Sequence, residues 1–534
     1  MLAWSAFLRP WPGKLIVLSL LALISNPAAA GMPAPGWPSF GYDLAGTRYN
    51  AGETRLSSQT VSQLKLNWVY KGGNDFSAQP AVANGVVYAA SWDGQLYAIR
   101  AATGELLWAF DVKNFHAPGV DGAIIRDTPA VDGRWLYVGD MHANLYRVQT
   151  ATGQVDWAVH LGRHPAAVIT GSPVLAEGRV YVGLSSNEEH VALQPDYPCC
   201  SFHGSLIAVD AGTGQIVWHY ETLPDAYQFG QREYQGKTIP KMGPSGSAIW
   251  SAPAIDLKRR LLYLTTGNDY SVPDQDYTDL TGTGPKRLSD GETGPEAKTS
   301  EAIIALNLDD GSLKWKKQLD AEDGPWTEDC LKGKSTGANC PAGQGGDFDF
   351  GAGPMLFTVH DAQGQPVPAV GAGQKSGWFH TLNAETGQVI WQTQVGPGGS
   401  LGGILWGTAT DGQRIYAPIS NAPNAGLLAA LDVNTGKVLW KRDDPGGRAD
   451  AAPAIAAGPR GKTVVFEGSM DGSVRAYDGA SGRVLWSAPT GASIYGGATV
   501  AGGALYVGSG YRNFGLGQPN DKLYAFSLDG AQNA

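Results

Sequence analysis

Residues 94–108 read GQLYAIRAATGELLW, and this phrase decides the fold because the chain repeats it seven times. The further copies are ANLYRVQTATGQVDW at 143–157, GSLIAVDAGTGQIVW at 204–218, EAIIALNLDDGSLKW at 301–315, GWFHTLNAETGQVIW at 377–391, GLLAALDVNTGKVLW at 426–440 and GSVRAYDGASGRVLW at 472–486. Such self-similarity is typical of folds in which each unit buries one face against the next unit. The repeat therefore indicates the architecture before any single residue is considered.

One unit, residues 78–110, shows what each repeat forms. Its runs VVYAAS, QLYAIR and ELLWAF are short, rich in Val, Ile, Leu and Tyr, and separated by Asp-Gly and Thr-Gly turns. This pattern predicts antiparallel hairpins, with glycine supplying positive φ at the turn. Each unit is expected to be a sheet of about four strands, as in one blade of a propeller. The closing Trp is expected to pack between neighbouring blades.

The two ends of the chain complete one more unit. The last unit, DKLYAFSLDG at 521–530, lacks a Trp strand, whereas LKLNWVY at 64–70 is a Trp strand with no unit before it. Together they make an eighth copy, and a closed ring leaves no exposed sheet edge. The sequence therefore predicts an all-β fold: one eight-bladed β-propeller domain over residues 31–534, closed by an N-terminal strand.

The first thirty residues differ from the repeats. Arg9 and Lys14 precede an apolar run at 15–24, and three alanines end at Ala30. This is the pattern of a secretory signal peptide, residues 1–30, cleaved near Ala30; the apolar run is too short to span a bilayer. Its removal takes away two positive charges and changes the net charge from −10 to −12. We expect a periplasmic or secreted protein without nucleic-acid binding or stable membrane insertion.

The chain has four cysteines, which export to an oxidising compartment would allow to pair. Cys330 and Cys340 are ten residues apart and would close one loop. Cys199 and Cys200 are adjacent, and either form a vicinal disulfide or remain free or separately paired thiols. The chain contains no Cys-x-x-Cys-His motif, so it carries no covalently attached c-type haem.

The repeat is stretched in its middle part. Successive closing Trp residues are 46 to 49 residues apart in the regular part, but 61, 97 and 76 residues apart between Trp157 and Trp391. Function in a propeller tends to lie in such insertions. The first insertion holds Glu188 and Glu189, either as surface acids or as part of a site.

Two further segments in the stretched part carry candidate functional residues. Trp250 lies outside the closing-Trp position, so its indole is free to support a planar ligand, and Asn268 supplies an oxygen ligand for a hard cation or is only a turn residue. Asp347 and Asp349 alternate along an extended run, so both point to one side. They indicate a metal site, a base beside a structural partner, or a solvated turn. Lys375 follows in an otherwise apolar blade.

At these residues the chain resembles the pyrroloquinoline quinone (PQQ) dehydrogenases, eight-bladed quinoproteins that oxidise alcohols or sugars outside the cytoplasm. It is most similar to the polyvinyl alcohol dehydrogenase-like branch without a fused cytochrome domain. The resemblance runs from residue 37 to near the C-terminus. The phrases that carry it are YPCCSFHGSLIAVDAGTG at 197–214, IWSAPAID at 249–256, TGNDYSVP at 266–273, DFDFGAGP at 347–354, AGQKSGWFHTLNAETG at 372–387, GGILWG at 402–407 and SMDGSVRAYD at 469–478.

The resemblance implies a role for each candidate residue. Asp347 would be the general base and Lys375 would lie by the reactive quinone oxygen. The calcium ion would be bound by Glu188, Asn268 and Asp347, with Glu189 as the alternative to Glu188. The residues implied to contact PQQ are Trp250 as the floor under the ring, Arg126 at a carboxylate, Thr170, Ser185, Lys375, Trp406 and, as a lid, Cys199 and Cys200.

Two departures from the family pattern bear on these roles. In the methanol dehydrogenase branch the Cys pair precedes the arginine that matches Arg126, whereas here it follows the calcium-binding Glu. That branch also has an asparagine where this chain has Leu405. The resemblance implies oxidation of a secondary or polymeric alcohol, with a soluble cytochrome c as electron acceptor. The alternative hypothesis is a non-enzymatic PQQ-like propeller that acts as an outer-membrane assembly scaffold or binding protein.

Overall fold

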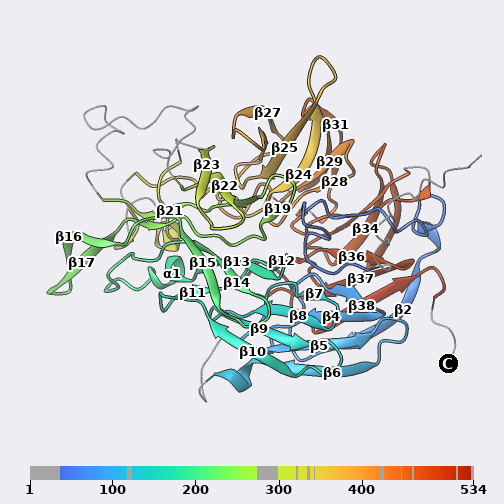
Figure 1. The fold of residues 1–534 in the computed structure, drawn as a ribbon, viewed down its shortest axis with the longest axis horizontal. Helices are drawn as coiled ribbons and strands as arrows, with labels where there is room; N and C mark the ends of the chain where they lie inside the picture. Colours follow the sequence, from blue (N-terminus) through green and yellow to red (C-terminus); the bar gives the residue numbers. More distant parts are fainter. Residues whose placement is uncertain are drawn as a thin grey trace, which may run out of the picture. The chain divides into compact units, whose positions relative to one another are not determined.

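The computed structural model of the chain describes residues 36–116, 123–273, 299–319, 323–332, 337–341, 343–420, 426–446, 448–459, 462–512 and 515–530. Residues 35–534 form one compact unit, and the predicted signal peptide lies outside the described residues. The fold is the predicted eight-bladed, all-β propeller (Figure 1). No helix among the described residues is long and apolar enough to cross a membrane.

Each blade is an antiparallel sheet of four strands, and the blades follow one another along the chain. Blades one to four are β3 (Ala81–Ala83), β4 (Val86–Ala90), β5 (Gln95–Arg100) and β6 (Leu106–Asp111); β7 (Ala130–Asp132), β8 (Trp135–Gly139), β9 (Asn144–Gln149) and β10 (Val155–His160); β12 (Val174–Ala176), β13 (Arg179–Ser186), β14 (Ser205–Asp210) and β15 (Ile216–Glu221); and β19 (Ala254–Asp256), β20 (Leu261–Thr265), β22 (Ala302–Asn307) and β23 (Leu313–Gln318). Blades five to eight are β24 (Met355–His360), β25 (Pro366–Gly373), β26 (Trp378–Asn383) and β27 (Val389–Gln394); β28 (Ala409–Thr410), β29 (Arg414–Ile419), β30 (Leu427–Asp432) and β31 (Val438–Asp443); β32 (Ala454–Ala456), β33 (Val464–Gly468), β34 (Ser473–Asp478) and β35 (Val484–Pro489); and β36 (Ala498–Ala501), β37 (Ala504–Ser509), β38 (Lys522–Ser527) and β2 (Lys65–Lys71).

The remaining elements are short and lie outside the blade pattern. They are β1 (Tyr49–Asn50), β11 (Ala167–Val168), the hairpin of β16 (Tyr227–Tyr234) and β17 (Lys237–Gly243), the pair β18 (Ser245–Gly246) and β21 (Asp269–Ser271), the helix α1 (Glu188–Val191), and the 3-10 helices η1 (Val61–Gln63), η2 (Val112–Phe115) and η3 (Glu328–Lys332). Most of them belong to the insertions of blades three to five, as the uneven Trp spacing predicts.

The closing Trp residues join each blade to the next, as predicted. Each indole Nε1 donates a hydrogen bond to a backbone carbonyl of the following blade, so the bonds run around the whole ring. The pairs are Trp68 to Ala101, Trp108 to Thr150, Trp157 to Ala211, Trp218 to Leu308, Trp315 to Ala384, Trp391 to Val433, Trp440 to Gly479 and Trp486 to Leu64, at 2.9 to 3.3 Å. A buried indole N–H thereby gains the partner that it needs.

The eighth blade closes the ring as the split repeat predicts. Strand β2 pairs antiparallel with β38, with Trp68 opposite Ala525. The first and last strands of the propeller thus belong to one sheet, and this sheet supplies the Trp that contacts blade one. The pairing ties both ends of the domain into the ring and leaves no unfinished blade.

An N-terminal segment that the repeat does not predict crosses one end of the central channel. Between residues 37 and 48 its carbonyl groups accept N–H groups from the inner strands of six blades. The donors are Val82, Val131, Ile255, Leu356, Thr410 and Ile455. Arg48, which is 2% exposed, donates to the carbonyls of Phe40 and Pro453 and to Gln79. This segment therefore forms a floor beneath the channel, on the side where Phe40 contacts the cavity described below.

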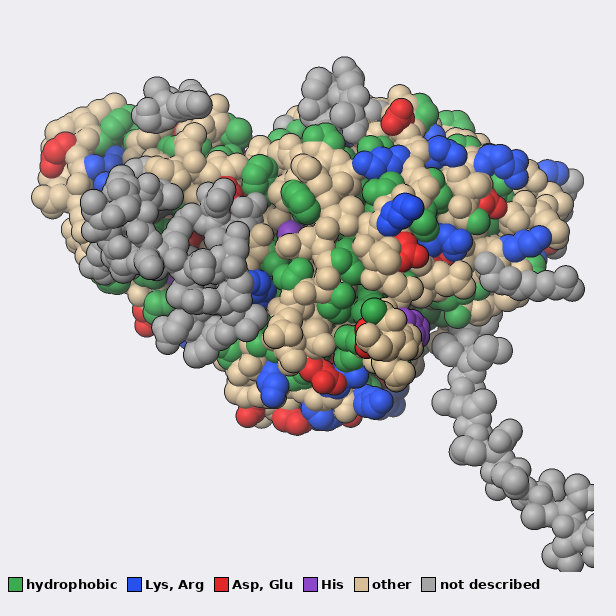
Figure 2. All heavy atoms as spheres, turned by 90° about the horizontal axis from the view of Figure 1, so that it is seen from above, with side chains coloured by type: hydrophobic (Ala, Val, Ile, Leu, Met, Phe, Trp, Pro, Cys, Tyr) green, Lys and Arg blue, Asp and Glu red, His purple; other side chains and the backbone are tan. Residues whose placement is uncertain are grey.

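The outer surface is mixed in charge. Figure 2 shows acidic and basic side chains interspersed on one face, among polar and isolated apolar groups. On the right-hand part of that face the Lys and Arg side chains predominate, whereas both signs alternate along its lower edge.

Candidate functional site

The candidate site is a cavity in the central channel, at the end where the inner strands begin. Four of the predicted residues, contributed by four different blades, line this one cavity: Arg126, Thr170, Trp250 and Trp406. The remaining wall residues are Phe40, Ser77, Ala78, Gln79, Thr128, Gly171, Ser172, Ser251, Ala252, Gly351, Tyr495 and Gly496. Each of these four residues lies shortly before the inner strand of its blade. The repeated blades therefore bring their side chains together near the channel axis.

Aromatic rings form one wall of the cavity. The rings of Trp250 and Trp406 meet edge to face with centroids 5.2 Å apart, and Trp406 meets Tyr495 in the same way at 5.1 Å. The Nε1 of Trp406 is buried and has no hydrogen-bond partner among the described residues. A buried donor without a partner is rare in proteins, so Trp406 fits a ligand that brings an acceptor.

Arg126 is surrounded by rings. Its guanidinium carbon lies 5.3 Å from the ring centroid of Trp92 and 5.8 Å from those of Trp406 and Tyr511, and an Nη atom is 3.5 Å from the Tyr511 hydroxyl. Across the described part of the chain no carboxylate pairs with it, although arginine prefers one. An anionic ligand in the cavity would supply this missing partner.

A buried group of charges lies beside Trp250. Lys375 Nζ donates to Asp347 Oδ1 at 2.8 Å and to Asp349 Oδ2 at 3.0 Å, and lies 5.8 Å from the Trp250 ring centroid. All three charged residues are at most 6% exposed. Asp349 Oδ1 also accepts the backbone N–H of Asn268 at 2.5 Å, so both of its oxygens are engaged. Lys375 is the sole hydrogen-bond donor to Asp347 among the described residues.

Burial sets the proton affinity of this group. Desolvation raises the pKa of Asp347 well above its usual value, and this effect outweighs the opposing attraction of Lys375. For Lys375, burial lowers the pKa, but the charges of Asp347 and Asp349 raise it by more, so the net shift is upward. The lysine therefore remains an ammonium ion, while Asp347 is a stronger base than an exposed aspartate.

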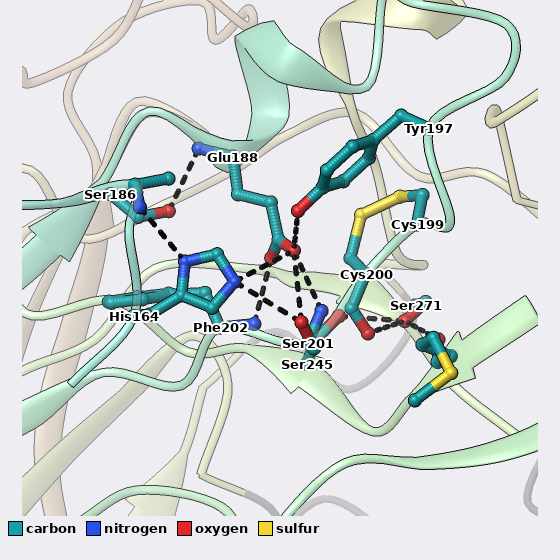
Figure 3. A network of polar contacts seen from close by, with 12 residues as sticks. His164, Ser186, Glu188, Tyr197, Cys199, Cys200, Ser201, Phe202, Ser245 and Ser271 are labelled. Atoms are coloured by element: carbon teal, nitrogen blue, oxygen red, sulfur yellow. Dashed lines mark hydrogen bonds and ion pairs between the residues drawn. A yellow bond between two sulfur atoms is a disulfide. The ribbon is translucent and has the colours of Figure 1, made fainter.

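The structure separates the two adjacent glutamates. Glu189 faces the charged group: its Oε1 is buried without a hydrogen-bond partner among the described residues, and burial followed by the charges of Asp347 and Asp349 raises its pKa well above the usual value. Glu188 points elsewhere, and both of its oxygens accept hydrogen bonds from the loop of residues 197–202 (Figure 3). The contacts thus favour Glu189 over the predicted Glu188 as the residue that is free to bind a cation.

Asn268 is oriented by its neighbours. Its Nδ2 donates to the carbonyls of Asp269 at 3.0 Å and Trp326 at 2.9 Å, which leaves Oδ1 as the available atom. Within the described ranges, however, no three His, Cys, Asp or Glu side chains converge closely enough to hold a metal by themselves. A cation at this place would therefore also use neutral oxygens, as calcium does.

Both cysteine pairs form disulfides, Cys199 with Cys200 and Cys330 with Cys340. Cys199 and Cys200 are buried in a hydrophobic cluster against which Trp250 packs. Neither residue, however, is part of the cavity wall. Ser185 also lies outside the wall; it stands on β13, opposite Val168 of β11.

Comparison with known proteins identifies the family. The model of the glucose/ethanol/alcohol dehydrogenase β-propeller domain of PQQ proteins matches residues 37–329, more than half of the chain. The chain belongs to the PQQ-dependent alcohol dehydrogenases. A second model, that of outer membrane protein assembly factor BamB, matches residues 301–518 of this quinoprotein.

Individual relatives narrow the branch. The quinoprotein is 31% identical to the polyvinylalcohol dehydrogenase of Sphingopyxis sp. (strain 113P3), over 89% of this chain and 74% of that protein. It is 29% identical to the polyvinylalcohol dehydrogenase of a Pseudomonas species, over 92% and 77%. It therefore falls in the polyvinyl alcohol dehydrogenase-like branch. The quinohemoprotein alcohol dehydrogenase of Comamonas testosteroni shares the fold, with a TM-score of 0.69, 20% identity and coverage of 93% and 81%.

The residues of this quinoprotein fit the family's cofactor. PQQ is a flat quinone with several carboxylates, and the cavity offers aromatic faces at Trp250 and Trp406. Within the part of the chain that the structure describes, the Trp406 indole N–H has no acceptor and the Arg126 guanidinium has no carboxylate partner. The free oxygens of Glu189 and Asn268, beside two buried aspartates, likewise suit a calcium ion.

Several site residues were missed at the level of sequence. The rings of Tyr495 and Tyr511 stack beside Arg126, with centroids 3.7 Å apart and an angle of 9° between their planes. The Trp92 ring also lies beside the Arg126 guanidinium. Their positions offered a weak signal: each follows a strand or precedes an inner strand at the same end of its blade as Trp250. Aromatic residues are so frequent in this chain that type alone did not distinguish them.

Proposed function

We propose that this protein is a periplasmic, PQQ- and calcium-dependent dehydrogenase that oxidises a secondary or polymeric alcohol to the carbonyl compound. The observation that carries the proposal is the buried group of Lys375, Asp347 and Asp349 beside Trp250, in a chain of this family. An ammonium held between two buried carboxylates has no evident role in joining blades. Perturbed, buried titratable groups next to a cavity are typical of catalytic sites.

Four of the residues that would hold PQQ line the cavity. Trp250 would support the flat ring, Trp406 would donate its free indole N–H, and Arg126 would pair with a carboxylate. Thr170 lines the same cavity, and its hydroxyl already bonds the Trp250 carbonyl at 3.4 Å. The Cys199–Cys200 disulfide, in the cluster against which Trp250 packs, would cover the ring from the insertion of blade three. Ser185 and Lys375 complete the proposed contacts.

The calcium ion would be held by Glu189, Asn268 and Asp347. This assignment replaces Glu188, because the two oxygens of that residue are already engaged by the loop of residues 197–202. Glu189 has the free buried oxygen, and the amide nitrogen of Asn268 is bound so that its oxygen is left for a ligand. Asp349, engaged by Lys375 and the backbone of Asn268, would orient the group.

When bound, PQQ supplies a two-electron acceptor and calcium supplies a Lewis acid for the reaction. The chain's own task is to move protons and hold charge. Asp347, with its raised pKa and an oxygen not bound by Lys375, would take the proton from the substrate hydroxyl. Lys375 would stabilise the negative charge that develops nearby, because its ammonium form is favoured by both aspartates.

The substrate class and the electron acceptor are proposed from the branch. Two relatives are named polyvinylalcohol dehydrogenases, which favours a secondary or polymeric alcohol. Oxidation releases two electrons and two protons for each alcohol converted. We propose that the protons leave through the protein and that the electrons pass, one at a time, to a separate soluble cytochrome c.

A direct assay tests the proposal. Purified protein is incubated with PQQ and calcium, then supplied with an artificial electron acceptor and a panel of primary, secondary and polymeric alcohols. We expect dye reduction that requires both additions and is fastest with secondary or polymeric alcohols. No cofactor binding and no dye reduction with any alcohol would reject the proposal.

A scaffold function is the second candidate, because the assembly-factor model matches residues 301–518. A scaffold needs the ring of blades but gives no reason for the charge group of Lys375 or for the caged guanidinium of Arg126. The same assay separates the two candidates, since a scaffold would bind no PQQ.

A further inference from the structure

Glu188 is a buried carboxylate at the centre of a polar network (Figure 3). Its Oε1 accepts the Tyr197 hydroxyl at 2.7 Å and the Ser201 N–H at 2.8 Å, and its Oε2 accepts the Phe202 N–H at 2.8 Å. These donors stand on both sides of Cys199 and Cys200. One side chain therefore holds both flanks of the vicinal disulfide.

His164 completes the network from blade three. Its Nδ1 accepts the backbone N–H of Ala166 at 3.1 Å, so in the neutral ring the proton is on Nε2. That nitrogen lies 3.4 Å from Glu188 Oε1 and 3.2 Å from the Ser201 hydroxyl. Burial raises the pKa of Glu188, but His164 and the two backbone donors lower it by more, so the carboxylate remains ionised.

The opposite side of the disulfide is also fixed. Cys200 N–H donates to the carbonyl of Met242, and Met242 N–H donates to the carbonyl of Cys199, each at 3.0 Å. Ser271 donates to the same Met242 carbonyl at 2.6 Å. The loop is thus anchored on the β17 side by backbone bonds, and on the α1 side by Glu188 alone among the described carboxylates.

Helix α1 links this network to the proposed metal site. Glu188 and Glu189 are consecutive, but only Glu188 bonds to the disulfide loop. Oε1 of Glu189 is buried without a hydrogen-bond partner among the described residues, and the charges of Asp347, Asp349 and Lys375 act on this carboxyl group. A helix of four residues has little stability of its own, so contacts outside it must hold it in place. The carboxylate of Glu188 is the principal such contact at its first residue.

We propose that Glu188 is a positioning residue, which holds the Cys199–Cys200 loop against helix α1 and thereby sets the place of Glu189. This inference rests on the proposed function where it treats Glu189 as a calcium ligand. Replacing one Glu188 carboxylate oxygen by an amide NH2 group would leave at least one of the backbone N–H groups of Ser201 and Phe202 without an acceptor, and the loop would open more often. The Glu189 carboxylate would then lose its fixed place beside Lys375.

The test uses Glu188→Gln, which preserves shape but turns an acceptor oxygen into a donor. Glu53→Gln is the matched control: Glu53 is 2% exposed and accepts three backbone N–H groups, those of Arg55, Leu56 and Gly503, far along the chain from the insertions. Glu189→Gln removes the proposed ligand itself. Two properties of the full-length protein are measured, namely the rate at which a phosphine reductant opens each disulfide, read by thiol labelling and mass spectrometry, and the affinity for calcium in the presence of PQQ, read by calorimetry.

We expect Glu188→Gln to speed reduction of Cys199–Cys200 about tenfold, to leave Cys330–Cys340 unchanged, and to weaken calcium binding about 10- to 100-fold, as is usual when the partner of a metal ligand is lost. Glu189→Gln should weaken calcium binding at least as much without changing either reduction rate. Tyr197→Phe, which removes one donor, should have a smaller effect on both properties than Glu188→Gln.

The proposal is overturned if Glu188→Gln behaves like Glu53→Gln, with neither property changed relative to wild type, or if it speeds reduction while calcium affinity stays at the wild-type value. Should the wild-type protein bind neither PQQ nor calcium, the proposed function fails, and the reduction rates alone then decide whether Glu188 positions the loop.

Discussion

The closing Trp residues of the blades and Trp406 of the cavity differ in what their indole N–H groups do. Each closing Trp donates to a carbonyl of the next blade, as Trp440 does to Gly479 at 3.1 Å. The Nε1 of Trp406 is also buried, yet it has no partner among the described residues, and the Trp250 ring meets that of Trp406 edge to face. The difference shows that tryptophan serves both regions. In the repeat its N–H group is hydrogen-bonded and the residue joins two blades, whereas in the channel the N–H group of Trp406 remains available for a ligand.

Charged side chains are buried in both parts of the ring. In the regular blades, Arg100 and Glu105 form an exposed ion pair, and such pairs contribute little to stability. Blade seven, however, has buried pairs, Arg448 with Asp450 and Arg475 with Asp444. In the stretched blades, Lys375 and two aspartates are buried together. Burying charges is costly unless each is compensated. The group of Lys375 differs from the buried pairs of blade seven in its place beside Trp250 of the cavity, and this place favours a role in chemistry.

The largest loss of activity is expected when the proposed base, Asp347, is replaced. Asp347→Asn should lower kcat about 10²- to 10⁴-fold, because a neutral amide cannot take the substrate proton. PQQ and calcium binding in the variant are measured alongside, to show that the site still forms. Asp349→Asn is the comparison, since Asp349 has both oxygens engaged and adjoins Trp250. Full activity in Asp347→Asn together with a large loss in Asp349→Asn would transfer the role of base to Asp349.

A pair of Trp substitutions tests the division between the two regions. Trp250→Leu should weaken PQQ binding about tenfold or more, through loss of the aromatic face, and change the melting temperature little. Trp440→Leu should do the reverse, destabilising the propeller by about 3 kcal/mol while PQQ affinity is retained. Fluorescence titration with PQQ and thermal unfolding are the measurements. If both variants lost only PQQ affinity, or both lost only thermal stability, the division between the two kinds of Trp would be wrong.

Calcium binding should depend on pH. Glu189 and Asp347 have raised pKa values, so protons compete with the metal, and affinity should rise as pH increases through those values, by up to about tenfold per unit for each proton displaced. Without metal, the free energy of unfolding should change with pH in the opposite direction. The folded state binds these two protons more tightly than the unfolded state, so their contribution to stability is present at low pH and is lost as pH rises. Melting temperatures with chelator and with calcium, across a pH series, check both trends; an affinity that does not vary with pH would contradict them.

The smallest effect concerns the repeat itself. Gly104 and Gly85 both have positive φ, 77° and 76°, but a Cβ on Gly104 would lie 2.8 Å from the Trp68 ring, whereas one on Gly85 meets nothing within 4 Å. Both alanine variants should lose about 1 kcal/mol from backbone strain, and Gly104→Ala should lose more because of the contact. Urea unfolding compares them. Equal losses would mean that the ring contact does not constrain the Thr-Gly turn.

Most of the fold could be predicted because each of the seven copies of the repeat predicts the same four-stranded unit. The turns, the Trp contacts and the split eighth blade, with Trp68 opposite Ala525, all follow from counting copies. The floor made by residues 37–48 could not be predicted, because its bonds are made by backbone carbonyls, for which side chains give no signal. Periodicity describes regular units and says little about a segment that crosses them all once.

The candidate site was predictable in outline and less so in detail. Arg126, Thr170, Trp250 and Trp406 meet in one cavity, since each stands at the same point of its repeat. The choice between Glu188 and Glu189 depended on which way each side chain leaves a four-residue helix, and adjacent residues differ by about 100° in direction there. Sequence spacing cannot resolve that choice, whereas the hydrogen bonds to Ser201 and Phe202 do.

The central claim is that residues of the stretched blades carry the proton and calcium chemistry of a PQQ site, to which Arg126 and Trp406 of the regular blades contribute cofactor contacts. The most direct measurement is a titration of the metal-free protein with PQQ, in the presence and absence of calcium, for wild type and Glu189→Gln. The account predicts tight, calcium-dependent binding to the wild-type protein and a loss of the calcium dependence in the variant. Equal binding in all four titrations, or none in the wild type with calcium, would contradict it.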